Sequence, residues 1–168
     1  MSENYYVTTP IYYPNGNLHI GHTYTTIVAD VIKRFKKLEG NDVFFVTGTD
    51  EHGQKIAEAA KKAGITPLEF TDAIVDTTKK LWKSLNIDYD VFERTTSEKH
   101  EALVQKVFKK LYDQGDIYKA NYSGLYCVPC EAYFTEAQAT DGHICPDCGR
   151  ELTKRDEESY FFRLSKYK

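Results

Sequence analysis

The sequence predicts an α/β fold in which a parallel sheet carries a small β-rich insertion. Two strand-like segments, at residues 4–9 and 43–47, flank a long helical pattern, and strand, helix, strand in that order is a βαβ unit with parallel strands. From about residue 116 the pattern changes to short alternating segments separated by turn residues. All 4 cysteines lie within this later part, which is therefore predicted to be a separate subdomain.

The predicted elements follow one another with short connections. Residues 10–17 form a turn-rich loop, and a helix is predicted from about His19 to Leu38 because apolar residues recur every three or four positions. Those apolar positions are Ile20, Tyr24, Ile27, Val28, Val31, Ile32 and Phe35. Further helices are predicted over 54–63, from Pro67 behind a Thr66 cap, and from a Ser97 cap to about 114. Strands are predicted at 117–122, 125–127 and 160–164.

Composition limits the classes of protein to which the chain can belong. With 168 residues, of which 41% are hydrophobic, it can form a globular core, and a net charge of −3 does not indicate binding to nucleic acid by bulk charge. The apolar runs are too short to span a bilayer and the first ten residues do not resemble a secretory signal, so a cytoplasmic protein without a membrane partner is expected. The basic cluster Lys33, Arg34, Lys36 and Lys37 predicts the solvated face of a helix.

The segment His19-Ile20-Gly21-His22 opens the first predicted helix. Two histidines three positions apart lie on one face of the first turn, where the unpaired N–H groups and the helix dipole also point. Gly21 has no Cβ, so a charged ligand could approach the backbone closely. Together these features predict a site for polyphosphate, or for negative charge developing on phosphorus. The alternatives are surface histidines without a role, or a metal-binding pair.

The cysteines form two Cys-x-x-Cys pairs, Cys127 with Cys130 and Cys145 with Cys148. Two such pairs predict four thiolate ligands around one tetrahedral zinc ion. Four thiolates close the coordination shell and leave no position for water, so the zinc ion should be structural. The alternatives are a redox dithiol or two disulfides, although a thioredoxin-like site has a single pair that opens a helix.

Several motifs together resemble one family. The segment 19–22 resembles the HIGH signature of class I aminoacyl-tRNA synthetases. Residues 8–16, TTPIYYPNG, resemble the stretch that introduces this signature in methionyl-tRNA synthetases, and residues 48–53, GTDEHG, match that family's second signature. The resemblance covers essentially the whole chain. It implies the first half of a Rossmann-like catalytic domain over residues 1–115, and a connective-peptide zinc knuckle over 116–168.

The resemblance also implies roles for individual residues. The residues implied to bind ATP are His19, Gly21 and His22, of which the two histidines would act in catalysis. Asp50 would bind the α-amino group of methionine, and Ile11 and Tyr13 would contact the methionine side chain. From the residues alone, Asp50 could also cap the following helix, and Ile11 and Tyr13 could be ordinary packing residues.

The activity implied by the resemblance is that of a methionine–tRNA ligase. Such an enzyme forms methionyl-adenylate from methionine and ATP, with Mg²⁺ accompanying ATP, and then transfers the methionyl group to tRNA(Met). The family also needs a Lys-Met-Ser-Lys-Ser-like loop, which this sequence lacks because its only methionine is Met1. An N-terminal fragment that is inactive alone is therefore expected, either a part of a longer chain or half of a split enzyme that pairs with its own C-terminal half. The alternatives are a zinc-knuckle RNA-binding module without catalysis, or a class I synthetase for another amino acid.

Overall fold

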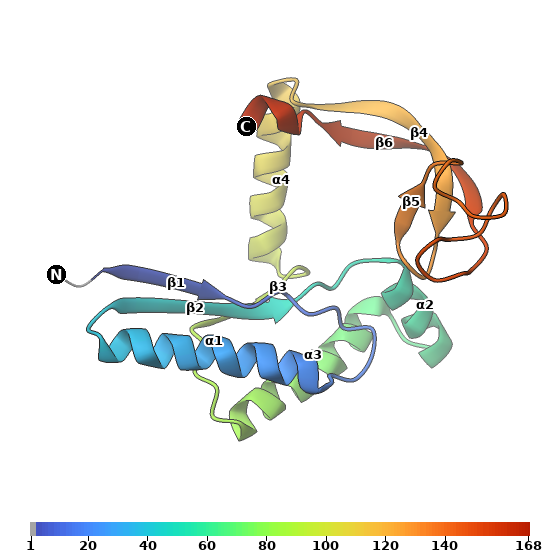
Figure 1. Cartoon of the computed structure of the whole chain (residues 1–168). Coiled ribbons are helices and arrows are strands. Elements are labelled where there is room, and N and C mark those ends of the chain that lie inside the picture. The colour runs from blue at the N-terminus through green and yellow to red at the C-terminus, as the bar shows by residue number, and fades with distance from the viewer. Residues whose placement is uncertain (1–2) are drawn as a thin grey trace. The chain divides into compact units, whose positions relative to one another are not determined.

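The computed structural model describes residues 3–168, which form two compact units. Unit 1 extends to Val104 and unit 2 runs from Gln105 to Lys168 (Figure 1). The two units divide within helix α4 (Glu98–Asp113), whose later turns carry Phe108 and Tyr112 against Tyr160 of unit 2. The predicted functional division between residues 115 and 116 stays a prediction.

Among the described residues, unit 1 contains a three-stranded parallel sheet with the strand order β1-β2-β3. The elements in chain order are β1 (Asn4–Thr8), α1 (Ile20–Leu38), β2 (Asp42–Thr49), α2 (Gln54–Ala63), α3 (Pro67–Ser84) and β3 (Val91–Arg94). In the register of the sheet, Val7 lies opposite Phe45 and Val46 lies opposite Val91. The predicted βαβ unit is confirmed. Strand β3 was not predicted, because it has only four residues and ends in two charged side chains.

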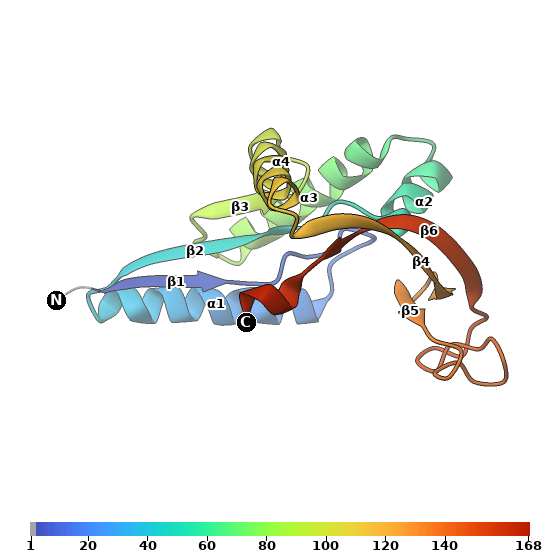
Figure 2. The same ribbon diagram turned by 90° about the horizontal axis from the view of Figure 1, so that it is seen from above.

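Helices α1 and α3 lie on the same face of this sheet, below the strands in Figure 1, which Figure 2 shows from above. Both β-α-β connections move in one direction along the sheet, and their usual right-handedness then places both helices on one side. The core lies between the helices and the sheet, and its buried members are Tyr12, Ala29, Phe45, Trp82 and Ile87. This core fixes the carboxyl ends of β1 and β2, the edge at which parallel sheets usually bind ligands.

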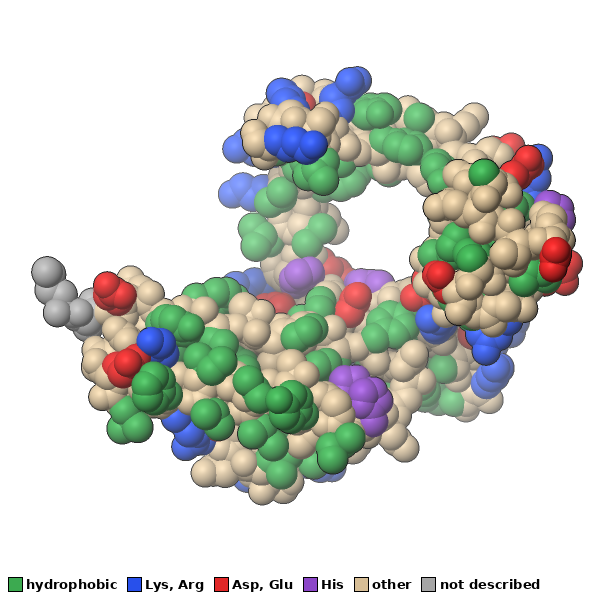
Figure 3. All heavy atoms as spheres, viewed as in Figure 1, with side chains coloured by type: hydrophobic (Ala, Val, Ile, Leu, Met, Phe, Trp, Pro, Cys, Tyr) green, Lys and Arg blue, Asp and Glu red, His purple; other side chains and the backbone are tan. Residues whose placement is uncertain are grey.

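The apolar stripe of α1 points away from the core of unit 1. An amphipathic helix usually buries its apolar stripe, but α1 buries Thr26, Ala29, Asp30 and Lys33 instead. The exposed apolar residues of α1 are Ile20, Tyr24, Ile27, Val28, Val31, Phe35 and Leu38. Figure 3 shows hydrophobic side chains gathered over the part of unit 1 that contains α1. Despite this stripe, no helix in the described part of the chain is long and apolar enough to cross a membrane.

The prediction of a solvated basic face is wrong for Lys33, which is fully buried. Its Nζ donates to the backbone oxygen of Asp88 at 2.7 Å and lies 2.9 Å from the Asp90 carboxylate. Burial lowers the pKa of Lys33, but hydrogen bonds to the two aspartates outweigh it, so the pKa is raised. The lysine therefore ties α1 to the segment before β3 as a charged group whose partners are in place.

Unit 2 is built on an antiparallel sheet with the strand order β5-β4-β6. Its strands are β4 (Ile117–Cys127), β5 (Ala132–Phe134) and β6 (Thr153–Phe162), followed by the short 3₁₀ helix η1 (Leu164–Tyr167). The later turns of α4 cover one face near Tyr160. A small core of Leu125, Leu152, Cys127 and Cys145 closes the far end of the sheet. The predicted β-rich subdomain is confirmed, with longer strands than the sequence pattern indicated.

Candidate functional site

The first turn of α1 carries the two histidines of the HIGH-like segment. His19 is the N-cap of the helix, and its Nδ1 accepts a hydrogen bond from the Gly21 N–H at 3.1 Å. The Nδ1 of His22 accepts a hydrogen bond from the His19 N–H at 3.0 Å. The two imidazole rings lie close together, with their centroids 3.8 Å apart. The predicted juxtaposition of the two histidines is therefore present.

These hydrogen bonds determine where each imidazole carries its proton. A neutral ring that accepts a hydrogen bond at Nδ1 must hold its hydrogen at Nε2, so both rings have an Nε2–H available to donate to a ligand. Burial, followed by the neighbouring His19, lowers the pKa of His22, so this ring is neutral at pH 7. The chemistry on offer is a pair of N–H donors at a helix N-terminus, which suits phosphate oxygens.

Gly21 leaves room for the His19 imidazole, and its role in ATP binding stays a prediction. A Cβ at this position would lie 2.9 Å from Cε1 of the His19 ring and 3.0 Å from its Nδ1. The space that a side chain would need is therefore taken by the His19 imidazole, which folds back over the first turn. Glycine at this position allows His19 to cap the helix.

Asp50 lies directly after β2, at the carboxyl end of the sheet. Its backbone N–H donates to the Tyr12 oxygen at 2.9 Å, which fixes the residue against the loop that follows β1. Within residues 3–168 the half-buried carboxylate has no hydrogen bond or ion pair. Helix α2 begins at Gln54 with Gly53 as its N-cap and has no side-chain cap, so the alternative role of Asp50 as a cap is wrong. The carboxylate is available to a cationic ligand.

Ile11 and Tyr13 lie in the loop between β1 and α1. Ile11 is exposed, whereas Tyr13 is half-buried against the start of α2. Gly53 has a φ of +132°, and a Cβ there would lie 2.2 Å from the Tyr13 hydroxyl oxygen. The Lys55 Nζ lies 5.9 Å from the centroid of the Tyr13 ring. Contact of Ile11 and Tyr13 with an amino-acid side chain stays a prediction.

A buried ionic cluster beside Asp50 was not predicted. The Glu51 side chain is fully buried and accepts two hydrogen bonds from Arg94, at 2.8 and 2.9 Å, together with bonds from the hydroxyls of Thr49 and Thr96. Arg94 also bonds Asp72 of α3 at 2.7 Å. Burial raises the pKa of the Glu51 carboxyl, but the hydrogen bonds from its partners outweigh it and hold the pKa below its ordinary value. The cluster fastens the Thr-Asp-Glu-His-Gly segment to β3 and α3.

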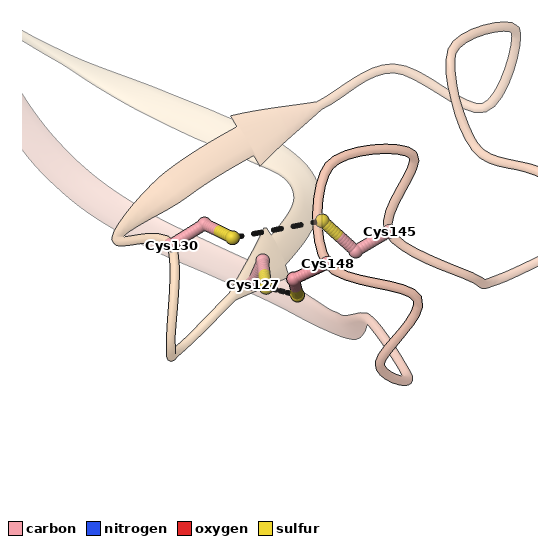
Figure 4. Close-up of side chains that lie close together, drawn as sticks. All are labelled: Cys127, Cys130, Cys145 and Cys148. Atoms are coloured by element: carbon pink, nitrogen blue, oxygen red, sulfur yellow. Dashed lines mark hydrogen bonds between the residues drawn. The ribbon is translucent and has the colours of Figure 1, made fainter.

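The four cysteines of unit 2 converge on one point (Figure 4). All four are free thiols, and their ligand atoms lie within 4.8 Å of one another. The sulfur atoms of Cys127 and Cys148 are 3.5 Å apart, and those of Cys130 and Cys145 are 3.9 Å apart. Tetrahedral zinc with Zn–S bonds of about 2.3 Å places its sulfur ligands about 3.8 Å apart. The cluster therefore has the donor atoms and the spacing that a four-thiolate metal site requires.

Each Cys-x-x-Cys pair is followed by a residue in the left-handed conformation, with φ of +52° at Glu131 and +69° at Gly149. In the second pair the Gly149 N–H donates to the Cys145 oxygen at 2.9 Å, which closes the turn. Glycine takes this conformation at no steric cost, whereas glutamate does not. In the first pair Glu131 takes the left-handed conformation in place of glycine, and its N–H donates to the Val128 oxygen at 3.3 Å, so the bond that closes this turn differs.

Unit 2 also carries a continuous row of aromatic rings on the sheet face opposite α4. The members of this aromatic row, in order, are Tyr126, Tyr133, Tyr122, Phe161 and Tyr118, with neighbouring centroids 4.7 to 6.1 Å apart. A guanidinium lies over each end, with Arg155 at 4.2 Å from the Tyr126 centroid and Arg163 at 4.6 Å from the Tyr118 centroid. Outward faces of antiparallel sheets are usually polar, so such a row is unusual. A row of rings with a planar cation at each end suits stacking on nucleobases.

Comparison with known sequences identifies close relatives of this chain. A family model described as tRNA synthetases class I (M) matches residues 5–159. The methionine–tRNA ligase of Clostridium tetani is 59% identical over 165 residues, and that of Clostridium perfringens is 62% identical over 163 residues. These alignments cover 98% and 97% of this chain but 26% and 25% of the relatives. The chain thus spans about a quarter of the length of the curated relatives it matches.

Solved structures of tRNA synthetases have the same fold as this chain. The Mycobacterium tuberculosis methionyl-tRNA synthetase in complex with methionyl-adenylate matches 98% of this chain and 33% of its own, with a TM-score of 0.88 and 43% identity. The LeuRS of Agrobacterium radiobacter K84, solved in a ternary complex with tRNA and LeuAMS, matches 99% of this chain and 22% of its own, with a TM-score of 0.80 and 27% identity. Both likenesses extend over the parallel sheet and over the β-rich subdomain that carries the cysteines.

Proposed function

We propose a function from one established premise: this chain belongs to the tRNA synthetases class I (M) family, whose model matches residues 5–159. The proposed function is that of the ATP-binding and methionine-binding part of a methionine–tRNA ligase. One observation carries it. The Asp50 carboxylate, which has no partner among residues 3–168, and the imidazole donors His19 and His22 adjoin the loop that follows β1.

In the proposed reaction the carboxylate oxygen of methionine attacks the α-phosphorus of ATP. A new O–P bond forms, the bond from the α-phosphorus to its bridging oxygen breaks, and pyrophosphate leaves with the electron pair. The Nε2–H groups of His19 and His22 donate to phosphate oxygens as charge shifts during this step. Because His22 is neutral, it donates without giving up a proton. Mg²⁺ would accompany ATP and neutralise part of the charge on its phosphates.

Asp50 is proposed to bind the ammonium group of methionine. Among the described residues its carboxylate has no other charged partner, and its backbone is fixed by Tyr12 and by the Glu51 cluster next to it. A charge-assisted hydrogen bond from a fixed carboxylate orients the amino acid so that its own carboxylate faces the histidines. Ile11 and Tyr13, in the same loop, are proposed to contact the thioether side chain, for which apolar and aromatic walls are suitable.

The four-thiolate cluster is proposed to hold one structural zinc ion. Cys127, Cys130, Cys145 and Cys148 supply all four ligands, so no coordination position remains for chemistry. When bound, the ion would cross-link the end of β4 to the loop before β6. Its contribution is therefore to the shape of unit 2.

The aromatic row supports tRNA(Met) as the second substrate. We propose that unpaired bases of the acceptor end stack on these rings, since stacking tolerates any base and contributes about 1–3 kcal/mol per base. The variant Tyr122→Leu should bind a fluorescent tRNA(Met) transcript about tenfold more weakly in an anisotropy titration. Tyr24→Leu, an exposed tyrosine on α1 outside the row, is the control. An equal loss of affinity for the transcript in both variants, or no loss of affinity in Tyr122→Leu, would rule out stacking on this row.

The exposed apolar stripe of α1 and the unpaired outer edge of β1 support a further partner. We propose that the remaining part of a longer ligase covers these surfaces, because a stripe of this size is otherwise costly in water. The same part would supply the Lys-Met-Ser-Lys-Ser-like loop. The chain alone is accordingly expected to show no adenylation, and to gain activity when a C-terminal fragment is added.

The test of the proposed function is ATP–pyrophosphate exchange against a panel of amino acids. The chain should be inactive alone and should catalyse methionine-dependent exchange with the C-terminal fragment of the 62%-identical Clostridium perfringens relative. The variant Asp50→Asn should raise the KM for methionine at least about 30-fold, because one side of a hydrogen-bonded charge pair is lost. Asp42→Asn, at the opposite end of β2, is the matched control and should leave the KM unchanged.

The remaining outcomes of this assay favour the alternatives. Exchange with a different amino acid would identify a synthetase of another specificity. An inactive reconstituted protein that still binds the tRNA transcript would favour an RNA-binding module without catalysis. A normal methionine KM in Asp50→Asn would remove Asp50 from the site.

A further inference from the structure

Tyr12 lies between two residues of the proposed site, Ile11 and Tyr13, and has been given no role in it. Its side chain is 6% exposed and belongs to the core of unit 1, next to Trp82 and Phe45. Neighbouring residues in a loop usually point in different directions, and Tyr12 points inward. Its contacts nevertheless reach both parts of the site.

The backbone of Tyr12 is joined to the end of β2. Its N–H donates to the Gly48 oxygen at 2.9 Å, and its oxygen accepts from the Asp50 N–H, also at 2.9 Å. These bonds continue the β1–β2 pairing as a single parallel bridge between Tyr12 and Thr49. The position of Asp50 is therefore tied to Tyr12 by the sheet itself.

The side chain of Tyr12 is joined to the first turns of α1. Its hydroxyl oxygen lies 2.7 Å from the Thr26 hydroxyl, with which it shares a hydrogen bond, and 3.2 Å from the His22 carbonyl oxygen. Thr26 also donates to the His22 oxygen, at 2.9 Å. The edge of the Tyr12 ring meets the His22 imidazole, with the centroids 4.9 Å apart and the planes at 77°. The ring and the hydroxyl together restrict where the His22 imidazole can lie.

We propose that Tyr12 is a positioning residue that sets His22 relative to Asp50. It acts through these two residues and does not itself touch a substrate. The inference rests on the proposed function, in which His22 binds the phosphates of ATP and Asp50 binds the amino group of methionine. Attack of a carboxylate on phosphorus is highly sensitive to the placement of the two reactants, so a fixed spacing between their binding residues is an advantage.

A purely structural role predicts a different pattern of effects. Tyr12 also fills the core, so a large substitution would weaken every property of unit 1 at once. The variant Tyr12→Phe separates the two roles, because it keeps the ring and the packing and removes only the hydroxyl that bonds α1. The backbone bond to Asp50 is retained in this variant.

The experiment compares Tyr12→Phe with the wild-type protein by two readouts. The ¹H–¹³C NMR signals of the His22 ring, in the chain alone, should shift. In the protein reconstituted with the C-terminal fragment, the KM for ATP should rise about five- to tenfold while the KM for methionine stays constant. Tyr89→Phe is the matched control, since Tyr89 packs against the same core and its ring meets Phe92.

The two readouts separate failure of the inference from failure of the proposed function. Unchanged His22 signals in Tyr12→Phe, or the same shifts in Tyr89→Phe, would overturn the inference whatever the activity. Shifted His22 signals with an unchanged KM for ATP would also overturn it, because the contact would then have no effect on the site. If the His22 signals shift in Tyr12→Phe but the reconstituted wild-type protein has no exchange activity, the positioning contact is supported and the proposed function is rejected.

Discussion

Removal of the proposed zinc ion from unit 2 is expected to unfold the end of that unit while unit 1 stays folded. The core at this end consists of Leu125, Leu152, Cys127 and Cys145, with few other apolar side chains packed against it. Such a core is too small to order its loops unless a metal ion joins the four thiolates. Structural zinc sites contribute roughly 10–16 kcal/mol of apparent binding free energy at pH 7, which is folding free energy when the site does not exist in the unfolded chain.

The sequence offers a convenient way to observe the two units separately. The single tryptophan, Trp82, is fully buried in the core of unit 1, whereas unit 2 has none. Chelation should release one zinc ion per chain, detected with a colorimetric zinc indicator, and should collapse the dispersed NMR signals of the tyrosines in unit 2. Trp82 fluorescence should not change. The variant Cys148→Ser should show the same loss without chelator, and Ser123→Ala on β4 should not.

Two results would contradict this expectation. A protein purified without zinc whose unit 2 is fully folded would show that the four thiols suffice without an ion. A red shift of Trp82 emission on chelation would show that the two units unfold together.

The sequence predicts those parts of this fold that depend on local pattern. The turn residues after β1, the spacing within α1 and the two Cys-x-x-Cys pairs each depend on few neighbouring residues, and each was located correctly. The cysteine cluster in particular needs only correct spacing, because two short turns bring four sulfur atoms to one point. The juxtaposition of His19 and His22 follows in the same way from helical geometry.

Features that depend on distant partners were missed. The basic cluster predicts a solvated Lys33 because no neighbouring residue indicates a contact with Asp88 and Asp90, which lie more than fifty residues further along the chain. The four-residue strand β3 is held by its pairing with β2 and not by its own propensity. The outward stripe of α1 is the clearest case. Periodicity indicates that a helix has an apolar face, but not which surface that face will meet.

The cluster around Glu51 is the second place where a large effect is expected. The variant Glu51→Gln should lower the free energy of unfolding of unit 1 by about 3 kcal/mol, because Arg94 would keep a partly buried charge after losing its bidentate partner. Urea denaturation followed by Trp82 fluorescence measures this, and a shift in midpoint without a change in slope would indicate an effect on stability alone. Glu39→Gln, which removes an exposed ion pair with Lys36, is the control and should leave the midpoint unchanged.

The pH dependence of the stability lost in Glu51→Gln tests whether the loss is electrostatic in origin. Because the folded protein holds the pKa of Glu51 below its ordinary value of 4.5, the ionised carboxylate stabilises the fold at pH above that value. This stabilisation is lost as the pH falls through the lowered pKa, when the carboxyl becomes protonated in the folded state as well. The difference in the free energy of unfolding between wild type and Glu51→Gln should therefore be constant from pH 6 to 7 and should become smaller below about pH 4.5. A difference in the free energy of unfolding that persists at low pH would mean that the amide in Glu51→Gln destabilises unit 1 for steric reasons. The attachment of the Asp50 segment to β3 and α3 would then depend on shape and not on charge.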